Sequence, residues 1–207
     1  MIQDCSVCPR LSGFLGQLQE QYPDYHNRPV APFGAEDARL LIVGLAPGMH
    51  GANASGRPFT GDHAGILLYR TLHEYGFASA SESLSVDDGL ELIDCRITNA
   101  VKCLPPQNKP VGSEIRNCNT YLRRELGVLD KGGIIIALGG IAHRAVISAL
   151  DLKQAGHPFG HAAEHDLPQN RLLIDSYHCS RYNTQTRRLT ESMFRQVFSR
   201  ARDLLSI

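Results

Sequence analysis

The chain has 207 residues, of which 43% are hydrophobic, and this is enough for one compact domain with a sizeable core. Lysine and arginine number 21, as do aspartate and glutamate, and the resulting net charge of zero excludes a uniformly basic surface for nucleic acid. No apolar stretch approaches transmembrane length, and residues 1–4 lead into Cys5 without a signal peptide. We therefore expect a single domain over 1–207 that is cytoplasmic, monomeric and without a membrane partner.

Helical and strand-like hydrophobic patterns alternate along the chain. The expected elements follow in chain order: a helix around 11–18, a strand at 39–43, a helix at 62–75, a strand at 92–101, a helix at 113–126 with Ser113 as N-cap, a strand at 133–138, a helix at 141–150, a strand at 171–176 and a helix at 191–205. The segments 22–38 and 154–170 are rich in Pro, His and Gly and are expected to be surface loops. This alternation predicts a three-layer α/β/α sandwich with a central, mainly parallel sheet.

A glycine-rich loop, residues 44–62, connects the 39–43 strand to the next helix. Such a loop lies at the carboxyl end of a parallel strand, where open α/β sheets bind ligands. Its polar and aromatic side chains would bind a flat polar ring better than a bare phosphate. These side chains are His50, Asn53, Arg57, Phe59 and Asp62. An ordinary tight connection would contain the same glycines, so the loop alone leaves both interpretations open.

The charged residues are unevenly distributed. Residues 71–95 contain six acids and neither lysine nor arginine, whereas residues 171–202 contain seven arginines and two acids. The second segment predicts a local basic face. Arg181, Arg187 and Arg188 flank a polar motif there and are expected to contact phosphates, while the arginines of the last helix fit a solvated helix face equally well.

Four of the six cysteines have a spacing that fits a metal site. Cys5 and Cys8 form a CxxC pair, and Cys103 and Cys118 follow much later in the chain. Four thiolates suit either tetrahedral zinc or a [4Fe-4S] cluster, and the spacing does not decide between them. Disulfides are not expected in a reducing compartment. The other two cysteines are expected to be packing residues: Cys95 and Cys179.

Four separated blocks cover most of the chain: CSVC at 5–8, GLAPGMHGANASGRPFTGD at 44–62, ITNAVKCLPPQNKP at 97–110 and HCSRYNTQTRRLT at 178–190. With Cys118, they resemble the uracil-DNA glycosylase superfamily, in particular its iron-sulfur class b (family 5) enzymes. The resemblance implies hydrolysis of the bond between a base and its sugar in DNA, which leaves an abasic site. It also implies a structural [4Fe-4S] cluster, held by Cys5, Cys8, Cys103 and Cys118.

The implied substrates are uracil, 5-substituted uracils and hypoxanthine. The implied partner is double-stranded DNA, and single-stranded DNA is left open. Because a base inside a duplex cannot reach an active site, its nucleotide must first be flipped out, at a cost of a few kcal/mol.

The resemblance also implies roles for single residues. Phe59 matches the aromatic that stacks on uracil, and Asn99 matches the amide that reads the pyrimidine edge. His178 matches the histidine that stabilises negative charge on the departing base. Two further contacts to the base are expected, from Ala46 and His50. Contacts to the DNA backbone, and to the gap left by the flipped base, are expected from Arg181, Asn183, Arg187 and Arg188.

One departure from many superfamily members concerns the attacking water. Residues 45–47 read Leu-Ala-Pro and lack the carboxylate or amide that positions water elsewhere, which is the mark of class b. His50 and Asn53 are the nearest polar residues, and Asp62 is the only acid in the loop. We therefore assign Asn53 and Asp62 to the catalytic group with His178, and expect no single indispensable general base.

Two other classes of function use the same features. An iron-sulfur nucleotide-binding or redox-sensing module would bind ligands through the loop and cysteines without turnover. A zinc-dependent hydrolase would draw its ligands from His50, His63, His143 and His178. This last class ranks lowest because the chain has no HxH or HExxH pair.

Overall fold

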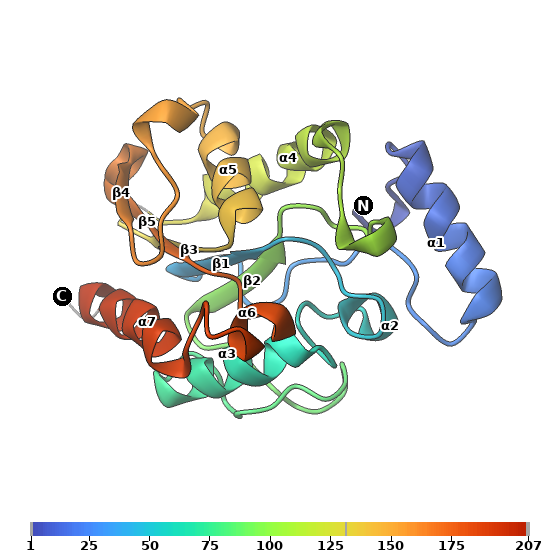
Figure 1. The fold of residues 1–207 in the computed structure, drawn as a ribbon, viewed down its shortest axis with the longest axis horizontal. Coiled ribbons are helices and arrows are strands. Elements are labelled where there is room, and N and C mark those ends of the chain that lie inside the picture. The colour runs from blue at the N-terminus through green and yellow to red at the C-terminus, as the bar shows by residue number, and fades with distance from the viewer. Residues whose placement is uncertain (1, 131, 206–207) are drawn as a thin grey trace.

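The computed structural model describes residues 2–130 and 132–205, which form a five-stranded sheet with helices on both faces (Figure 1). The strands are β1 (Leu40–Gly44), β2 (Cys95–Asn99), β3 (Ile134–Leu138), β4 (Glu164–Leu167) and β5 (Arg171–Ser176). The helices are α1 (Pro9–Gln21), α2 (Ala52–Ser55), α3 (His63–Glu74), α4 (Gly112–Val128), α5 (Gly140–Ala149), α6 (Arg181–Gln185) and α7 (Glu191–Leu205). Short 3-10 helices occur at Ile2–Asp4, Pro106–Asn108, Gln154–Gly156 and Pro168–Asn170. Four residues of the expected domain lie outside this description: Met1, Lys131, Ser206 and Ile207.

The strand order is β2-β1-β3-β5-β4. The first four strands of this order are parallel, and β4 pairs antiparallel with β5 at one edge. The carboxyl ends of β1, β2, β3 and β5 therefore meet at one edge of the sheet. That edge is where an open α/β sheet places its ligand site.

The two faces of the sheet carry separate hydrophobic layers, because alternate residues of a strand point to opposite sides. Leu40 and Ile42 of β1 pack with α3 and α7, whereas Leu41 and Val43 pack with α4 and α5. Figure 1 shows α4 and α5 on one side of the sheet and α3 and α7 on the other. Every residue of β1 and β3 is buried, as expected for strands covered on both faces. The predicted three-layer α/β/α sandwich is confirmed.

The two segments expected to be surface loops contribute to the sheet. Segment 154–170 contains β4, whose Glu-His-Asp-Leu sequence carries almost no hydrophobic signal. In segment 22–38, Phe33 forms an antiparallel bridge with Ile97 on the free side of β2. Both segments therefore cover sheet edges that would otherwise present unpaired backbone groups.

Helix α4 begins one residue earlier than predicted, so Ser113 is not its N-cap. The preceding residue is Val111, and its N–H donates to a carboxylate oxygen of Glu114 at 2.8 Å. Arg10 of α1 also donates to this carboxylate, through Nε at 2.7 Å. Glu114 thus fastens the amino-terminal helix to α4.

Within the described ranges, no helix combines the length and the apolar character needed to cross a membrane.

Candidate active site

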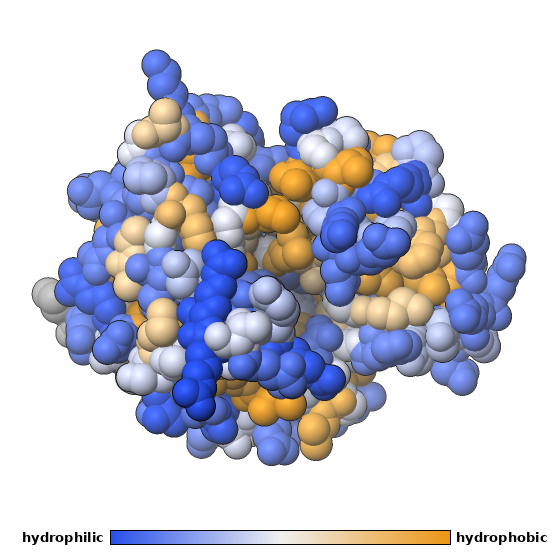
Figure 2. Space-filling view, in the orientation of Figure 1, coloured by the Kyte–Doolittle hydropathy of each residue, from blue (hydrophilic) through white to orange (hydrophobic). Residues whose placement is uncertain are grey.

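A cavity of about 430 Å³ opens at the carboxyl edge of the sheet. Figure 2 shows the face that carries α6, with a hollow near its centre in which hydrophobic side chains are visible. The first loop, the ends of β2 and β3, the start of α5 and the segment after β5 all contribute to the cavity wall. Prominent lining residues are Ala46, Gly48, Phe59, Asp62, Asn99, Gly139, His178 and Arg181. Six of these eight belong to the residues predicted from the sequence.

Phe59 is fixed in the cavity wall by its backbone. Its φ of 58° lies in the left-handed region, which bulky residues rarely adopt. Helix α3 holds this conformation, because the Tyr69 hydroxyl donates to the carbonyl of Pro58 at 2.7 Å. Gly65 lacks the side chain that would overlap the Phe59 carbonyl. The aromatic ring is therefore held in place in the cavity wall.

Asn99, the last residue of β2, lies beside Gly44, the last residue of β1. The side chain is buried, and its Oδ1 has no hydrogen-bond partner among the described residues. A Cβ on Gly44 would overlap this oxygen and lie 2.7 Å from Cζ of Phe59. Glycine is thus required at position 44 so that the amide and the aromatic ring can approach the strand.

His178 follows β5 and faces Phe59, with ring centroids 6.1 Å apart and planes at 26°. Burial lowers the pKa of His178 to about 4, so the imidazole is neutral at physiological pH. Its Nδ1 is buried and has no partner among the described residues. Asn183 donates from Nδ2 to the His178 carbonyl at 2.8 Å, and Ser180 accepts from the Asn183 N–H at 3.4 Å to cap α6. The first turn of α6 therefore fixes the backbone that carries the histidine.

Asp62 brings a carboxylate to the cavity from the far end of the first loop. It accepts a hydrogen bond from the Ala52 N–H, and burial raises its pKa. Gly48 and Gly51 make room for it, since a Cβ on Gly48 would lie 2.5 Å from Oδ1 of Asp62. The loop thus supplies, through its last residue, the charged group that its Leu-Ala-Pro segment lacks.

The four spaced cysteines lie close to one another, near the start of α1 and beside α4. They are Cys5, Cys8, Cys103 and Cys118. Burial, and after it the charges of the other three thiols, raise the pKa of the Cys103 thiol to about 12. Since neighbouring thiolates repel one another, a bound cation is needed to hold all four deprotonated.

The surroundings of these thiols fit a bound group. Asn117 donates a hydrogen bond from Nδ2 to Cys8 Sγ at 3.3 Å, and the Tyr121 hydroxyl donates one to the Cys5 sulfur. Donors of this kind stabilise charged sulfurs. All six cysteines are free thiols in the structure, and Cys95 and Cys179 are fully buried.

A family model described as the uracil DNA glycosylase superfamily matches residues 31–202. The chain belongs to this superfamily. A Type-5 uracil-DNA glycosylase of Thermus thermophilus is 45% identical over 98% of the chain and 94% of the relative. One of Pyrobaculum aerophilum is 38% identical over 96% of the chain and 88% of the relative. A Type-4 uracil-DNA glycosylase of Saccharolobus solfataricus is 31% identical over 84% of the chain and 76% of the relative.

Two predicted residues of this superfamily member lie away from the cavity wall. The side chain of Asn53 is fully buried, and its Nδ2 donates to Oδ1 of Asn27 at 2.9 Å. His50 is exposed, and its Nδ1 lies 3.0 Å from the hydroxyl of Tyr25. Neither side chain lines the cavity, although Oδ1 of Asn53 is buried without a partner among the described residues and His50 interacts electrostatically with Asp62. A contact of either residue with base or water stays a prediction.

The four predicted DNA-binding residues occupy four different places. Arg181 lines the mouth of the cavity, and Arg187 lines an adjoining groove that also contains Arg70. The guanidinium of Arg188 lies over the ring of Tyr177, 4.9 Å from its centroid. Asn183 holds the His178 backbone instead of facing outward.

The four histidines proposed for a zinc hydrolase are not brought together. Among the described residues, the one group whose ligand atoms all lie within 4.8 Å of one another combines His143 with two residues outside that set. The sequence also missed His63 and the 139–141 turn as lining residues of the cavity. A signal for the turn was available, because glycines directly after a buried strand leave room for a ligand.

Proposed function

We propose that this protein excises uracil from DNA by hydrolysing the N-glycosidic bond. The observation that carries the proposal is the convergence of Phe59, Asn99 and His178 on one cavity. Two of these residues present buried polar atoms without a partner, Oδ1 of Asn99 and Nδ1 of His178. Buried polar atoms are normally satisfied, so these two favour a polar ligand as the missing partner. The names of the relatives, Type-5 and Type-4 uracil-DNA glycosylase, support uracil in DNA as that ligand.

The base would be bound by one aromatic face and one amide. In this proposal a flipped uracil stacks on Phe59, and Asn99 accepts from uracil N3–H and donates to O4. Cytosine presents the reverse pattern of donor and acceptor, so the same amide would reject it. The fixed backbone of Phe59 and the glycine at position 44 support this role, because neither group must move to meet the base.

His178 would stabilise the leaving group. As the bond breaks, negative charge moves onto the base, chiefly onto O2, and a neutral imidazole N–H could donate to it there. Because burial keeps the pKa of His178 at about 4, the ring enters the reaction without a charge of its own. A preorganised donor of this kind is worth roughly 3 kcal/mol.

Asp62 would position the water that attacks the sugar. Its carboxylate lines the same cavity, and its raised pKa makes it a better proton acceptor than an exposed carboxylate. Asn53 and His50 have no place in this step. The sequence already assigns Asp62 to the catalytic group with Asn53. The proposal differs in giving the water to Asp62 alone, whereas the sequence predicts no single indispensable general base.

We also propose that Cys5, Cys8, Cys103 and Cys118 hold a [4Fe-4S] cluster. Four converging thiols with hydrogen-bond donors at their sulfurs support it, as does the Type-5 name of the relatives. When bound, the cluster supplies a rigid cross-link between the amino-terminal segment and α4. The chemical step itself is left to Asp62 and His178.

We also propose how the DNA is contacted and which further bases are accepted. Double-stranded DNA would be contacted through Arg181 at the cavity mouth and Arg187 in the adjoining groove. Hypoxanthine and 5-substituted uracils would also be accepted, because a cavity of about 430 Å³ has room for a ring larger than uracil.

Duplex oligonucleotides carrying U:G, U:A or hypoxanthine test these proposals directly. After incubation with the protein, alkali cleaves the strand at each abasic site, and electrophoresis measures the product. A module without turnover would bind the duplexes and leave no alkali-labile site. That result would refute the enzymatic proposal and favour the iron-sulfur binding module.

A further inference from the structure

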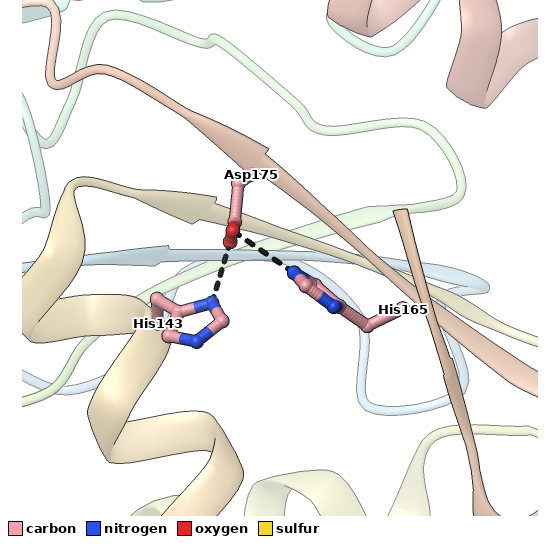
Figure 3. Close-up of side chains that lie close together, drawn as sticks. All are labelled: His143, His165 and Asp175. Carbon is pink, nitrogen blue, oxygen red and sulfur yellow. Dashed lines mark hydrogen bonds and ion pairs between the residues drawn. The ribbon is translucent and has the colours of Figure 1, made fainter. Parts of the chain in front are cut away.

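Three buried side chains outside the cavity form a compact cluster (Figure 3). His143 comes from α5, His165 from β4 and Asp175 from β5. Their side chains are 1%, 9% and 0% exposed. Both imidazole rings point toward the carboxylate of Asp175. None of the three lines the cavity, so the proposed glycosylase chemistry does not account for them.

The hydrogen bonds of His143 call for one more proton or a metal ion at this cluster. Its Nε2 lies 2.8 Å from the carbonyl oxygen of His157, which can only accept, so Nε2 carries a hydrogen. Its Nδ1 lies 2.8 Å from Oδ1 of Asp175, which is also an acceptor when ionised. A neutral imidazole has one N–H and cannot donate to both. Either a second proton lies between Nδ1 and the carboxylate, or a metal ion beside them binds both.

The third residue makes the arrangement suitable for a metal ion. Nε2 of His165 lies 3.2 Å from Oδ2 of Asp175, and the three ligand atoms all lie within 4.8 Å of one another. Ligands bound tetrahedrally to Zn²⁺ at its usual bond lengths lie about 3.3 Å apart. The 3.2 Å between His165 and Asp175 is close to this spacing, and the 2.8 Å between His143 and Asp175 would lengthen when the ion binds. A zinc-binding histidine usually donates its other N–H to a carbonyl or carboxylate, as His143 does to His157.

We propose that His143, His165 and Asp175 bind one Zn²⁺ ion through two imidazole nitrogens and a carboxylate. The Gly160 N–H, which donates to Oδ2 of Asp175 at 3.3 Å, orients the carboxylate from outside. The ion takes a structural role, since its ligands are buried and belong to three different elements. It fastens the edge strand β4 and helix α5 to β5. This site uses nitrogen and oxygen ligands, and is independent of the four cysteines and of the proposed function.

Metal uptake by the purified protein tests the proposal. Protein handled anaerobically, so that the cysteine site stays intact, is treated with EDTA and then titrated with ZnCl₂ in a calorimeter. We expect one equivalent to bind and the melting temperature to rise by about 5 °C. X-ray absorption at the zinc edge should show nitrogen and oxygen ligands at about 2.0 Å and no sulfur at about 2.3 Å.

Matched variants locate the ion. Asp175→Asn and His165→Gln should each abolish zinc uptake. His157→Gln should retain it, because the backbone carbonyl that accepts from His143 is unchanged. If Asp175→Asn fails to fold, the titration of the unaltered protein still decides. The proposal is overturned if the protein takes up no zinc, or if X-ray absorption finds sulfur among the zinc ligands. The extra group at His143 would then be a proton. None of these readouts depends on base excision, so they stand or fall separately from the proposed function.

Discussion

His178 and Asp62 face one cavity, and burial shifts their pKa values in opposite directions. Burial lowers the pKa of the histidine to about 4 and raises that of the carboxyl group. Both shifts disfavour the charged form and follow from the same loss of water. A neutral donor on one side and a proton acceptor on the other are what hydrolysis of a glycosidic bond to a poor leaving group needs.

Replacing His178 with alanine should slow single-turnover excision of uracil by about a hundredfold. The loss of one preorganised donor costs roughly 3 kcal/mol of transition-state stabilisation. Affinity for the duplex should stay nearly unchanged, because the ring is half-buried and phosphate contacts lie elsewhere. Rapid-quench kinetics with excess enzyme and a binding titration measure the two effects. Excision at the normal rate in this variant would refute the leaving-group role.

Asp62→Asn should also slow excision by about a hundredfold, the lower end of the range for general base catalysis.

The unaltered protein should lose activity as the pH falls through the pKa of Asp62, because a protonated carboxyl group cannot accept from water. Since burial raises that pKa, the loss should begin at a higher pH than for an exposed aspartate. The asparagine variant should lack this acidic limb. A limb that persists in the variant would assign it to another group.

At the scale of the elements, the end of β1 is the most constrained point of the site. Gly44→Ala would place a Cβ 2.7 Å from Cζ of Phe59 and against Oδ1 of Asn99. Both proposed base-binding groups would be displaced together, so we expect single-turnover excision to fall by about tenfold or more. Gly13→Ala on α1 is the control, because an added Cβ meets nothing there within 4 Å. Equal excision rates for the two variants would contradict the proposed base contacts.

The segment that follows α6 should supply part of the DNA affinity. Arg187→Ala should weaken binding about equally for duplexes with and without uracil, and should lower the salt dependence of log Kd by about one unit. Arg200→Ala is the matched control, since Arg200 on α7 pairs with Glu164 at 2.8 Å away from the groove. Electrophoretic or fluorescence titrations at several salt concentrations measure the difference. A loss confined to the uracil-containing duplex would mean that Arg187 reads the lesion.

The sequence predicted the elements with strong hydrophobic periodicity and missed those without it. Buried strands such as β1 and β3 read as continuous apolar runs, and the amphipathic α7 shows its helical pattern clearly. Strand β4 is polar, and α2 has four residues, so neither carries enough signal. Ser113 was assigned as a cap from its residue type, whereas the carboxylate of Glu114 bonds the backbone there.

The candidate site also contains residues that the sequence predicts and residues that it does not. Phe59, Asn99 and His178 could be predicted because each lies at a strand end or in a recognisable motif. The return of Asp62 to the cavity depends on how Gly48 and Gly51 let the loop fold back, which residue spacing does not encode. His143 and Asp175 are 32 residues apart, and only the sheet order brings them together.

For the molecule as a whole, anaerobically purified protein should be brown, with broad absorption near roughly 400 nm from thiolate-to-iron charge transfer. Cys103→Ser and Cys118→Ser should each remove the colour. Cys95→Ser and Cys179→Ser are the controls, because these two thiols are buried, with their pKa values raised by burial, and lie outside the set of four. Metal analysis that found zinc without iron at the four cysteines would refute the cluster.

The apolar packing around the cysteines reaches the first loop, since Ala46 and Met49 pack against the hydrophobic cluster that contains Cys103 and Cys118. The loop that lines the cavity therefore rests on the same support as the cysteine site. If that support depends on iron, a cell starved of iron would make the normal amount of protein with a loosened first loop. Repair of deaminated cytosine would then decline before the level of the protein did, and mutation rate would follow iron supply.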